Sequence, residues 1–325
     1  MIILEKKFFS FKIFFFVVAL YVVLLSAISF GLINSYWAGI LNITLINIIL
    51  VVSLNLATGF LGQLTLAHSG FMAIGAYASI AVTKFLSMKG YFEFPLALIC
   101  AGLLSMTLAF FISIPAMKIA GNHLVIITLA VNEIIRNLII NLNIGNGSSG
   151  LRGIAHYSNF TIVFVITILI IAVIYLLLNS KYGLAIVCIP QNEMLAKSCS
   201  INTFYYKLAA FSLTAFFAGI AGGLYAHEIT VIEPNMFDYS YSLELLAMVI
   251  IGGLGSIEGS IISAIVLTIL PYLFSFAFDL RIIIYLAGMI AVMMYMPNGL
   301  FSQYKTFISN LTSMLKEKKL LNLKR

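Results

Sequence analysis

The sequence predicts an all-α fold, a polytopic bundle of about ten transmembrane helices with the N- and C-termini in the cytoplasm. Of its 325 residues, 62% are apolar and only 9% are charged, whereas a soluble domain carries about 25% charged residues. A transmembrane helix needs about 20 mostly apolar residues, so the chain has enough for about ten. The apolar runs are continuous, which excludes the alternating strands of a membrane β-barrel. The composition also excludes a soluble enzyme, a nucleic-acid-binding protein and a disordered chain.

The apolar runs mark the expected spans, with boundaries good to about 2–4 residues. In chain order they cover residues 12–33, 37–58, 68–86, 94–117, 121–143, 159–179, 206–228, 241–256, 259–278 and 280–297. The first run is longer than the apolar region of a signal peptide, and no small-x-small cleavage site follows it, so we expect an uncleaved span. The third and eighth runs are short and glycine-rich, and either could be a broken or re-entrant helix surrounded by protein.

The basic residues set the orientation. If the N-terminus is cytoplasmic, 13 of the 18 Lys and Arg residues fall on the cytoplasmic side, as the positive-inside rule requires. They are the three lysines of the N-terminal region, Lys118, the three lysines of 181–207 and six basic residues of the tail. The acidic side chains near the expected external end are Glu228, Glu233, Asp238 and Glu244.

The chain contains no soluble domain. We expect an N-terminal cytoplasmic segment at 1–11, a transmembrane domain at 12–300 with a cytoplasmic segment at 181–206, and a basic cytoplasmic tail at 301–325. The tail could lie on the inner leaflet as an amphipathic helix, or remain a solvated tail.

Two stretches place polar side chains beside or inside apolar runs, and they supply candidates for lining a pathway through the membrane. The candidates are Gln63, His68, Asn132, Glu133 and Asn137. Polar and ionisable groups are costly in a bilayer and usually face a cavity or a partner. The structural alternative is tight packing around 59–79 and an i,i+3 ion pair between Glu133 and Arg136. For Glu133 and Arg136, a structural ion pair is favoured over direct contact with a substrate.

Small residues predict close helix packing and helix breaks. Ala215, Gly219 and Gly223 recur every four residues, which is typical of helices packed tightly in a membrane. Gly252, Gly253 and Gly255 lie in GGLGSIEGS, which superficially resembles a phosphate-binding loop but lacks its GK[ST] ending. A glycine-rich break at membrane depth is the better interpretation.

The motifs of common enzyme sites are absent from the sequence. It contains no Walker A motif, no HExxH, no GxSxG and no paired CxxC, so the chain cannot hydrolyse ATP by the usual machinery. The number and spacing of Cys100, Cys188 and Cys199 suggest neither a disulfide framework nor a metal site. We therefore expect no enzyme activity and no metal.

The polar segment at 181–207 is too long for a tight turn. Residues 187–202 are expected to form one polar helix of about four turns that docks on a cytoplasmic partner; an ordinary loop is the alternative. The i, i+3, i+4, i+7 spacing puts Glu193, Ala196, Lys197 and Ser200 on one face. Glu193 is the residue expected to contact the partner, because its carboxylate also suits a helix N-terminus.

Several segments resemble, in the right order, those of the permease subunits of branched-chain amino acid ABC transporters, on the LivM-like side of the pair. They are GQLTLAHSGFMAIGAYA, GNHLVIITLAVNEIIRN, the run from Asn192 to Phe211, AFFAGIAGGLYAH, the run from Glu233 to Ile265, and MYMPNGLF. The resemblance extends from about residue 40 to 302. It departs from the family at Pro190, where arginine is usual, and at Ser200, where glycine is usual.

The resemblance implies an importer at the bacterial inner (plasma) membrane. It implies a second, LivH-like permease subunit, two cytoplasmic ATPase subunits that bind the ATP, and an external substrate-binding protein, while the chain itself holds no cofactor. It makes 181–206 the coupling segment, with candidate ATPase contacts at Gln191, Asn192, Glu193, Ala196, Lys197 and Ser200. The implied cargo is leucine, isoleucine and valine.

Two alternatives remain open on the sequence alone. The same family could import urea, short amides or another amino acid. An ion-coupled secondary transporter would need buried titratable groups of its own, and Glu133 is the only persuasive one. A purely structural membrane subunit has the least support.

Overall fold

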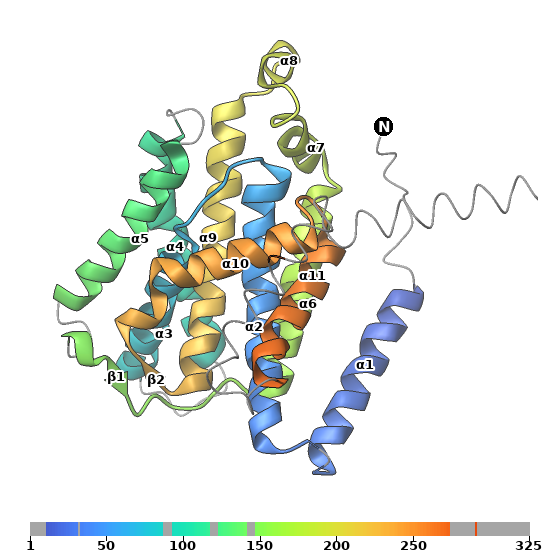
Figure 1. Cartoon of the computed structure of the whole chain (residues 1–325), viewed down its shortest axis with the longest axis vertical. Coiled ribbons are helices and arrows are strands. Elements are labelled where there is room, and N and C mark those ends of the chain that lie inside the picture. Colours follow the sequence, from blue (N-terminus) through green and yellow to red (C-terminus); the bar gives the residue numbers. More distant parts are fainter. Residues whose placement is uncertain are drawn as a thin grey trace, which may run out of the picture.

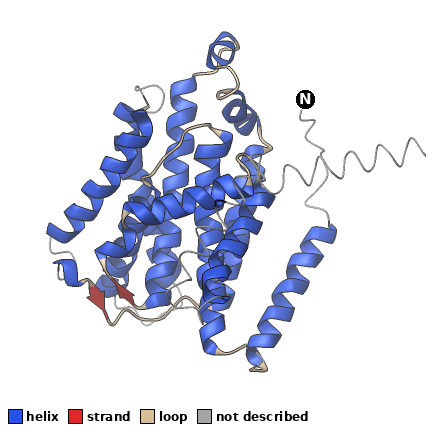
Figure 2. Cartoon of the chain, viewed as in Figure 1, coloured by secondary structure: helices blue, strands red, loops and turns tan. Residues whose placement is uncertain are grey.

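The computed structural model describes residues 11–31, 33–86, 93–117, 123–141, 147–273 and 290, and nearly all of them are helical (Figures 1 and 2). The predicted all-α class is therefore confirmed. Apart from Ile290, the expected tenth span lies outside the described residues, as do the segment 1–10, the tail at 301–325 and both termini.

The described helices follow the predicted apolar runs closely. They are α1 (Phe11–Ser29), α2 (Ser35–Asn55) with a π-helical turn η1 (Leu56–Phe60), α3 (His68–Leu86), α4 (Glu93–Ala116), α5 (His123–Asn141), α6 (Phe160–Leu178), α7 (Lys181–Cys188), α8 (Glu193–Ser198), α9 (Thr203–Ile229), α10 (Tyr239–Gly252) and α11 (Ile257–Leu273). Five of the described helices are long and apolar enough to cross a membrane: Ser35–Phe60, Glu93–Ala116, Leu124–Asn141, Phe160–Leu178 and Thr203–Ile229. The expected count of ten spans stays a prediction.

Helices α2 and α9 form the centre of the bundle and run side by side (Figure 1). Helix α9 packs against α3 and α4, while α2 packs against α6, α10 and α11. Most of α2 from Ile46 to Asn55 is buried on every side, as expected for a helix that is apolar all round. Small residues let α9 approach its neighbours, so its glycines lie inside this core.

Helix α10 is too short to cross a membrane as a complete span. Its 14 residues reach about 21 Å, well short of the roughly 30 Å hydrocarbon core. It crosses the other helices obliquely, and α11 then descends from its end (Figure 1). Between them Gly253 and Gly255 have φ of 105° and 78°, a region that glycine adopts without strain. The eighth run is therefore a short helix that ends in a glycine break, the first of its two interpretations.

The expected single helix at 187–202 is wrong, because the chain forms two short helices there, α7 and α8. Pro190 lies in the turn between them and has no N–H to continue the helical ladder. Asn192 is extended, and its side chain accepts a hydrogen bond from the N–H of Leu195, so it caps a new helix. Both helices lie at one end of the molecule (Figure 1).

A small antiparallel pair of strands lies at the opposite end, and the sequence did not predict it. Strand β1 (Leu151–Arg152) pairs with β2 (Val231–Ile232). A 3-10 turn η2 (Gly147–Ser149) precedes β1, and another, η3 (Pro234–Phe237), connects β2 to α10. These elements tie the loop between α5 and α6 to the end of α9.

Candidate functional site

The coupling segment is held to the bundle by a small apolar cluster. This cluster consists of Leu61, Ile186, Ile189, Ala196 and Ala210. Its members come from the segment after α2, from α7 and the turn that follows it, from α8 and from α9. Ala196 is only 4% exposed, so it anchors α8 from below and is not part of an outward face.

The outward face of the segment carries large apolar side chains among polar ones. Met194 is 82% exposed, and Leu195, Tyr182 and Leu184 are exposed with it. Among the expected contact residues, Gln191, Asn192, Lys197 and Ser200 are also exposed. The predicted face of Glu193, Ala196, Lys197 and Ser200 is therefore not presented as one unit, whereas the sequence reasoning missed the exposed residues Met194 and Leu195.

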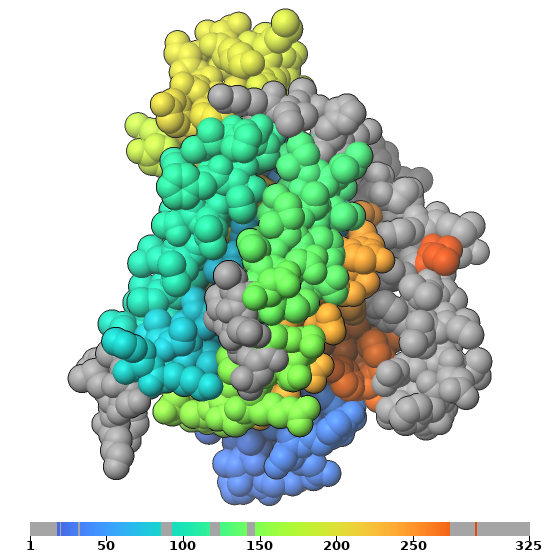
Figure 3. All heavy atoms as spheres, turned by 90° about the vertical axis from the view of Figure 1, so that its left-hand side faces the viewer, coloured from blue at the N-terminus to red at the C-terminus, as the bar shows by residue number. Residues whose placement is uncertain are grey.

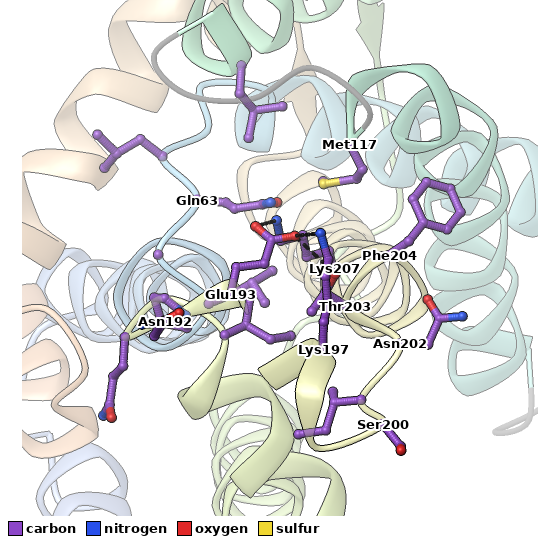
Figure 4. Close-up of a pocket in the computed structure, with 18 of the residues that line it drawn as sticks. Gln63, Met117, Asn192, Glu193, Lys197, Ser200, Asn202, Thr203, Phe204 and Lys207 are labelled. Atoms are coloured by element: carbon purple, nitrogen blue, oxygen red, sulfur yellow. Dashed lines mark hydrogen bonds and ion pairs between the residues drawn. The ribbon is translucent and has the colours of Figure 1, made fainter. Parts of the chain in front are cut away.

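The Glu193 carboxylate turns toward α9 (Figure 4). Its Oε2 lies 2.8 Å from Lys207 Nζ, and its Oε1 accepts a hydrogen bond from Thr203 Oγ1 at 3.0 Å. Lys197 Nζ lies 3.2 Å from the same Oε1. The hydrogen bond from Lys207 is the main cause that lowers the pKa of this carboxyl to about 2, against a partial desolvation that raises it. A lowered pKa keeps these contacts complete above about pH 4.5 and weakens them only as pH falls toward about 2, so Glu193 is ionised at neutral pH.

A cavity of about 1050 Å³ lies beside the coupling segment, and we call it the coupling cavity (Figure 4). It is bounded by the segment after α2, the adjoining ends of α4 and α5, the turn after α7, and the start of α9. Its polar lining residues include Gln63, Gln191, Asn192, Glu193, Lys197, Ser200, Asn202, Thr203 and Lys207. Gln63, expected on a membrane pathway, thus lies with the coupling residues instead, and its Oε1 is buried without a described partner.

A second polar site lies within the bundle, and we call it the polar junction. It joins Ser69 at the start of α3, Asn132 in the middle of α5 and Ser242 in α10. Ser69 Oγ lies 2.9 Å from Asn132 Oδ1 and 2.7 Å from Ser242 Oγ, and Ser69 N–H donates to Ser242 Oγ at 3.0 Å. Asn132 is fully buried. Its Nδ2 donates to Phe237 O at 3.4 Å, and Ser69 Oγ also lies 2.9 Å from Asp238 O. The junction is therefore a closed contact between α3, α5 and α10.

The other expected pathway residues lie near this junction or on the outside of α5. His68 is buried, and its Nε2 lies 3.0 Å from Ser53 Oγ. Glu133 pairs with Arg136 at 2.8 Å, and Arg136 donates to Asn235 Oδ1 at 3.2 Å. Asn137 is exposed and donates only to the carbonyl of Glu133 in its own helix.

Helix α2 carries three asparagines that the sequence reasoning missed. Asn42 Nδ2 donates to Glu228 Oε2 at 3.0 Å. Asn47 donates to Thr268 Oγ1 at 3.0 Å and accepts from Tyr241 Oη at 2.7 Å. Asn55 donates to Ser260 Oγ at 2.7 Å and accepts from the N–H of Gly255 at 3.0 Å. The sequence could have indicated them, because asparagines spaced along an otherwise apolar run each need a hydrogen-bond partner inside a membrane.

The five glycines singled out from the sequence all lie at contacts or breaks. An added Cβ at Gly219 would lie 2.7 Å from Ala101 O, and one at Gly223 would lie 2.7 Å from Leu98 Cδ2, so both face α4. At Gly252 it would lie 2.6 Å from Gly259 O. Gly253 and Gly255 form the break before α11. Among the described residues, no group of three or more His, Cys, Asp or Glu side chains could hold a metal ion.

The sequence model of a family described as "Branched-chain amino acid transport system / permease component" matches residues 36–295. The high-affinity branched-chain amino acid transport system permease proteins LivM of Escherichia coli and of Salmonella typhimurium are each 29% identical over 297 residues, covering 80% of this chain and 69% of theirs. The autoinducer 2 import system permease protein LsrC of Yersinia pseudotuberculosis is 25% identical over 213 residues, covering 61% of this chain and 60% of its own length. No solved structure matches the chain. Because the family match spans most of the sequence, this protein belongs to that family of transport permeases and is an integral membrane protein.

Proposed function

We propose that the protein is the LivM-like transmembrane subunit of an ATP-driven importer that carries leucine, isoleucine and valine across the bacterial inner membrane. A second, LivH-like permease completes the pathway, two cytoplasmic ATPases drive it, and an external binding protein delivers the amino acid. The N- and C-termini are cytoplasmic. The observation that carries the proposal is the coupling segment, a two-helix projection at one end of an apolar bundle.

The exposed side chains of α7 and α8 support docking to a cytoplasmic protein. Tyr182, Leu184, Met194 and Leu195 lie within 14 residues of one another in an otherwise polar stretch. Exposed apolar side chains gathered on one projecting polar segment are typical of protein interfaces. A short projecting helix can fill a groove in a partner with such side chains. The bundle end that carries this patch is the one that the basic residues place in the cytoplasm.

The outer side of α5 supports an interface with the second permease. The exposed side chains of α4 and α6 are uncharged, as lipid contact requires. By contrast, Glu133 and Arg136 are each 26% exposed, and Asn137 and Asn141 beside them are exposed. Figure 3 shows α5 (green) between α4 (teal) and α10 (orange) on one face of the molecule. A charged pair facing lipid would be costly, so we place the translocation pathway and the second subunit on this side.

The relatives' names support a branched-chain amino acid as cargo, and they also supply a second candidate. LivM of two enterobacteria belongs to amino acid transport systems by name, whereas LsrC belongs to an autoinducer 2 import system by name. The second candidate is therefore a permease of this same architecture with another cargo, such as autoinducer 2, urea, a short amide or another amino acid.

The test is uptake by the reconstituted complex of both permeases, the ATPases and the binding protein. We expect leucine uptake that needs ATP and the binding protein, and that excess isoleucine and valine suppress. Uptake driven by a proton or sodium gradient without ATP would instead establish a secondary transporter. ATP-dependent uptake of another solute, with none of leucine, would keep the importer and replace its cargo.

A further inference from the structure

Helix α8 is anchored by very little packing. It has six residues, of which only Ala196 is buried. A helix this short is not stable by itself. Beyond the contact of Ala196 with the apolar cluster, its position relative to the bundle depends on the polar contacts of its side chains, and the contacts that reach α9 come from Glu193.

The Glu193 contacts link α8 to the first two turns of α9. Lys207 is only 16% exposed on its side chain and lies 2.8 Å from Glu193 Oε2, while Thr203 is buried and donates to Oε1. Charge-assisted hydrogen bonds between partly buried groups are strong and directional. The pair with Lys197 differs, because Lys197 is 62% exposed and belongs to α8 itself. Of the Glu193 contacts, those with Lys207 and Thr203 therefore join α8 to α9, whereas the contact with Lys197 stays within α8.

A second contact links the coupling segment to the start of α3. An added Cβ at Gly62 would lie 2.6 Å from Pro190 Cβ, so the turn between α7 and α8 rests directly on the segment after α2. That segment runs from Leu61 to Ala67 and leads into α3, whose second residue, Ser69, belongs to the polar junction. If the turn between α7 and α8 moves, its contact with Gly62 can therefore carry the movement along this segment to the polar junction.

We propose that Glu193 is a positioning residue which, through Lys207, locks α8 to α9 and so converts ATPase movement into movement of the central helix. This inference rests on the proposed function, since it presupposes that the coupling segment docks on an ATPase. It assigns the two sides of α8 different tasks. Met194 and Leu195 face the partner, and Glu193 faces inward and carries the motion to α9.

The test separates transmission from docking in the reconstituted complex. Docking is measured by crosslinking from the exposed native cysteines Cys188 and Cys199, with Cys100 replaced by alanine, through a thiol-to-amine reagent that reacts with ATPase lysines. Transmission is measured as leucine transported per ATP hydrolysed. The informative variants are Lys207→Met and Glu193→Gln, and Arg152→Met is the matched control, because it removes one positive charge from an exposed position of β1, outside the coupling segment.

We expect Lys207→Met to retain crosslinking and ATP hydrolysis while transport per ATP falls roughly tenfold, the scale set by losing a charge-assisted hydrogen bond. Glu193→Gln should act in the same direction. Arg152→Met should change the ratio by less than about twofold. The exchanged pair Glu193→Lys with Lys207→Glu should restore most of the ratio, since it rebuilds the same contact.

Each other result has a definite meaning. An unchanged ratio in both Lys207→Met and Glu193→Gln overturns the linkage. Loss of crosslinks in step with transport also overturns it, because the pair would then only shape the docking surface. Absence of crosslinks in the wild-type complex that still transports leucine would overturn docking by this segment, and with it the proposed mechanism.

Discussion

At the residue scale, the end of α8 shows a side chain that does not suit its backbone. Ser200 has φ of 61°, in the left-handed region where a side chain costs about 1–2 kcal/mol. Its N–H bonds to Lys197 O, and the N–H of Ile201 bonds to Ala196 O. This pair of bonds is the Schellman ending, whose left-handed position is usually glycine. The family usually has glycine at residue 200, and the left-handed backbone there explains that preference.

We predict that Ser200→Gly stabilises α8 locally by about 1 kcal/mol. Ser198→Gly is the matched change two residues earlier, within the helix, and should destabilise it by about 0.5–1 kcal/mol. Hydrogen exchange of the α8 amides measures both effects as local opening free energies. A change of the same sign in both variants would contradict the argument from backbone conformation.

The residue scale also shows the limits of sequence reasoning about the site. The sequence identifies Glu193 as the charged group at a helix start, but helix spacing cannot tell whether a carboxylate points to a partner protein or to Lys207. Likewise Gln63 and Asn132 are both polar groups near apolar runs. Only the folded chain separates them, placing Gln63 in the coupling cavity and Asn132 in the polar junction.

At the element scale, close helix contacts depend on glycines of α9. Gly222 faces α3, where an added Cβ would lie 2.9 Å from the carbonyl carbon of Met72 and 3.0 Å from Ala76 N. These are backbone atoms, so relief requires the two helices to separate. The sequence reasoning chose Gly219 and Gly223 by their spacing and missed Gly222, because the stripe facing α4 and the contact facing α3 lie on different sides of the helix.

We predict that Gly222→Ala destabilises the protein by about 1–3 kcal/mol through overpacking between α3 and α9. Gly39→Ala in α2 is the control, because the nearest atom to its added Cβ is Glu228 Oε1 at 3.7 Å. That variant should be neutral or gain up to about 1 kcal/mol from helix propensity. Unfolding in detergent with increasing denaturant gives both values. Equal losses in both variants would show that the helix contact is not the cause.

Helix boundaries were predictable where the end of the helix coincides with the end of an apolar run in the sequence. The run 68–86 coincides with α3, and 94–117 differs from α4 by one residue at each end. Prediction failed where tertiary contacts decide. The oblique path of α10 depends on its contacts with α2, α3 and α5, and the break at residues 189–192 depends on Pro190 and the Asn192 cap. Hydrophobicity alone does not encode either.

At the whole-molecule scale, the two ends of the bundle differ in charge. Lys181, Lys197 and Lys207 lie at the end with α7 and α8, whereas Glu228, Glu233 and Asp238 lie near β2 and the start of α10. The positive-inside rule assigns the first end to the cytoplasm. The even number of spans and the cytoplasmic termini remain predictions of this orientation.

We predict that Ser149→Cys, in η2 beside β1, reacts with a membrane-impermeant thiol reagent in intact cells. The exposed native cysteines Cys188 and Cys199 should react with it only after the membrane is permeabilised. Labelling each protein with the reagent before and after permeabilisation gives the result directly. Labelling of Cys188 and Cys199 in intact cells, with Ser149→Cys protected, would reverse the orientation.

The asparagines of α2 have a consequence for the order of events during synthesis. The partners of Asn47 and Asn55 in α10 and α11 lie between 194 and 221 residues further along the chain. At roughly 5–20 residues per second, translation needs about 10–40 seconds to produce them. During that interval α2 has left the ribosome with amides that neither lipid nor its early neighbours satisfy. Water, the insertion machinery or a temporary helix must therefore provide partners for the asparagine side chains of α2 until α10 and α11 have been synthesised.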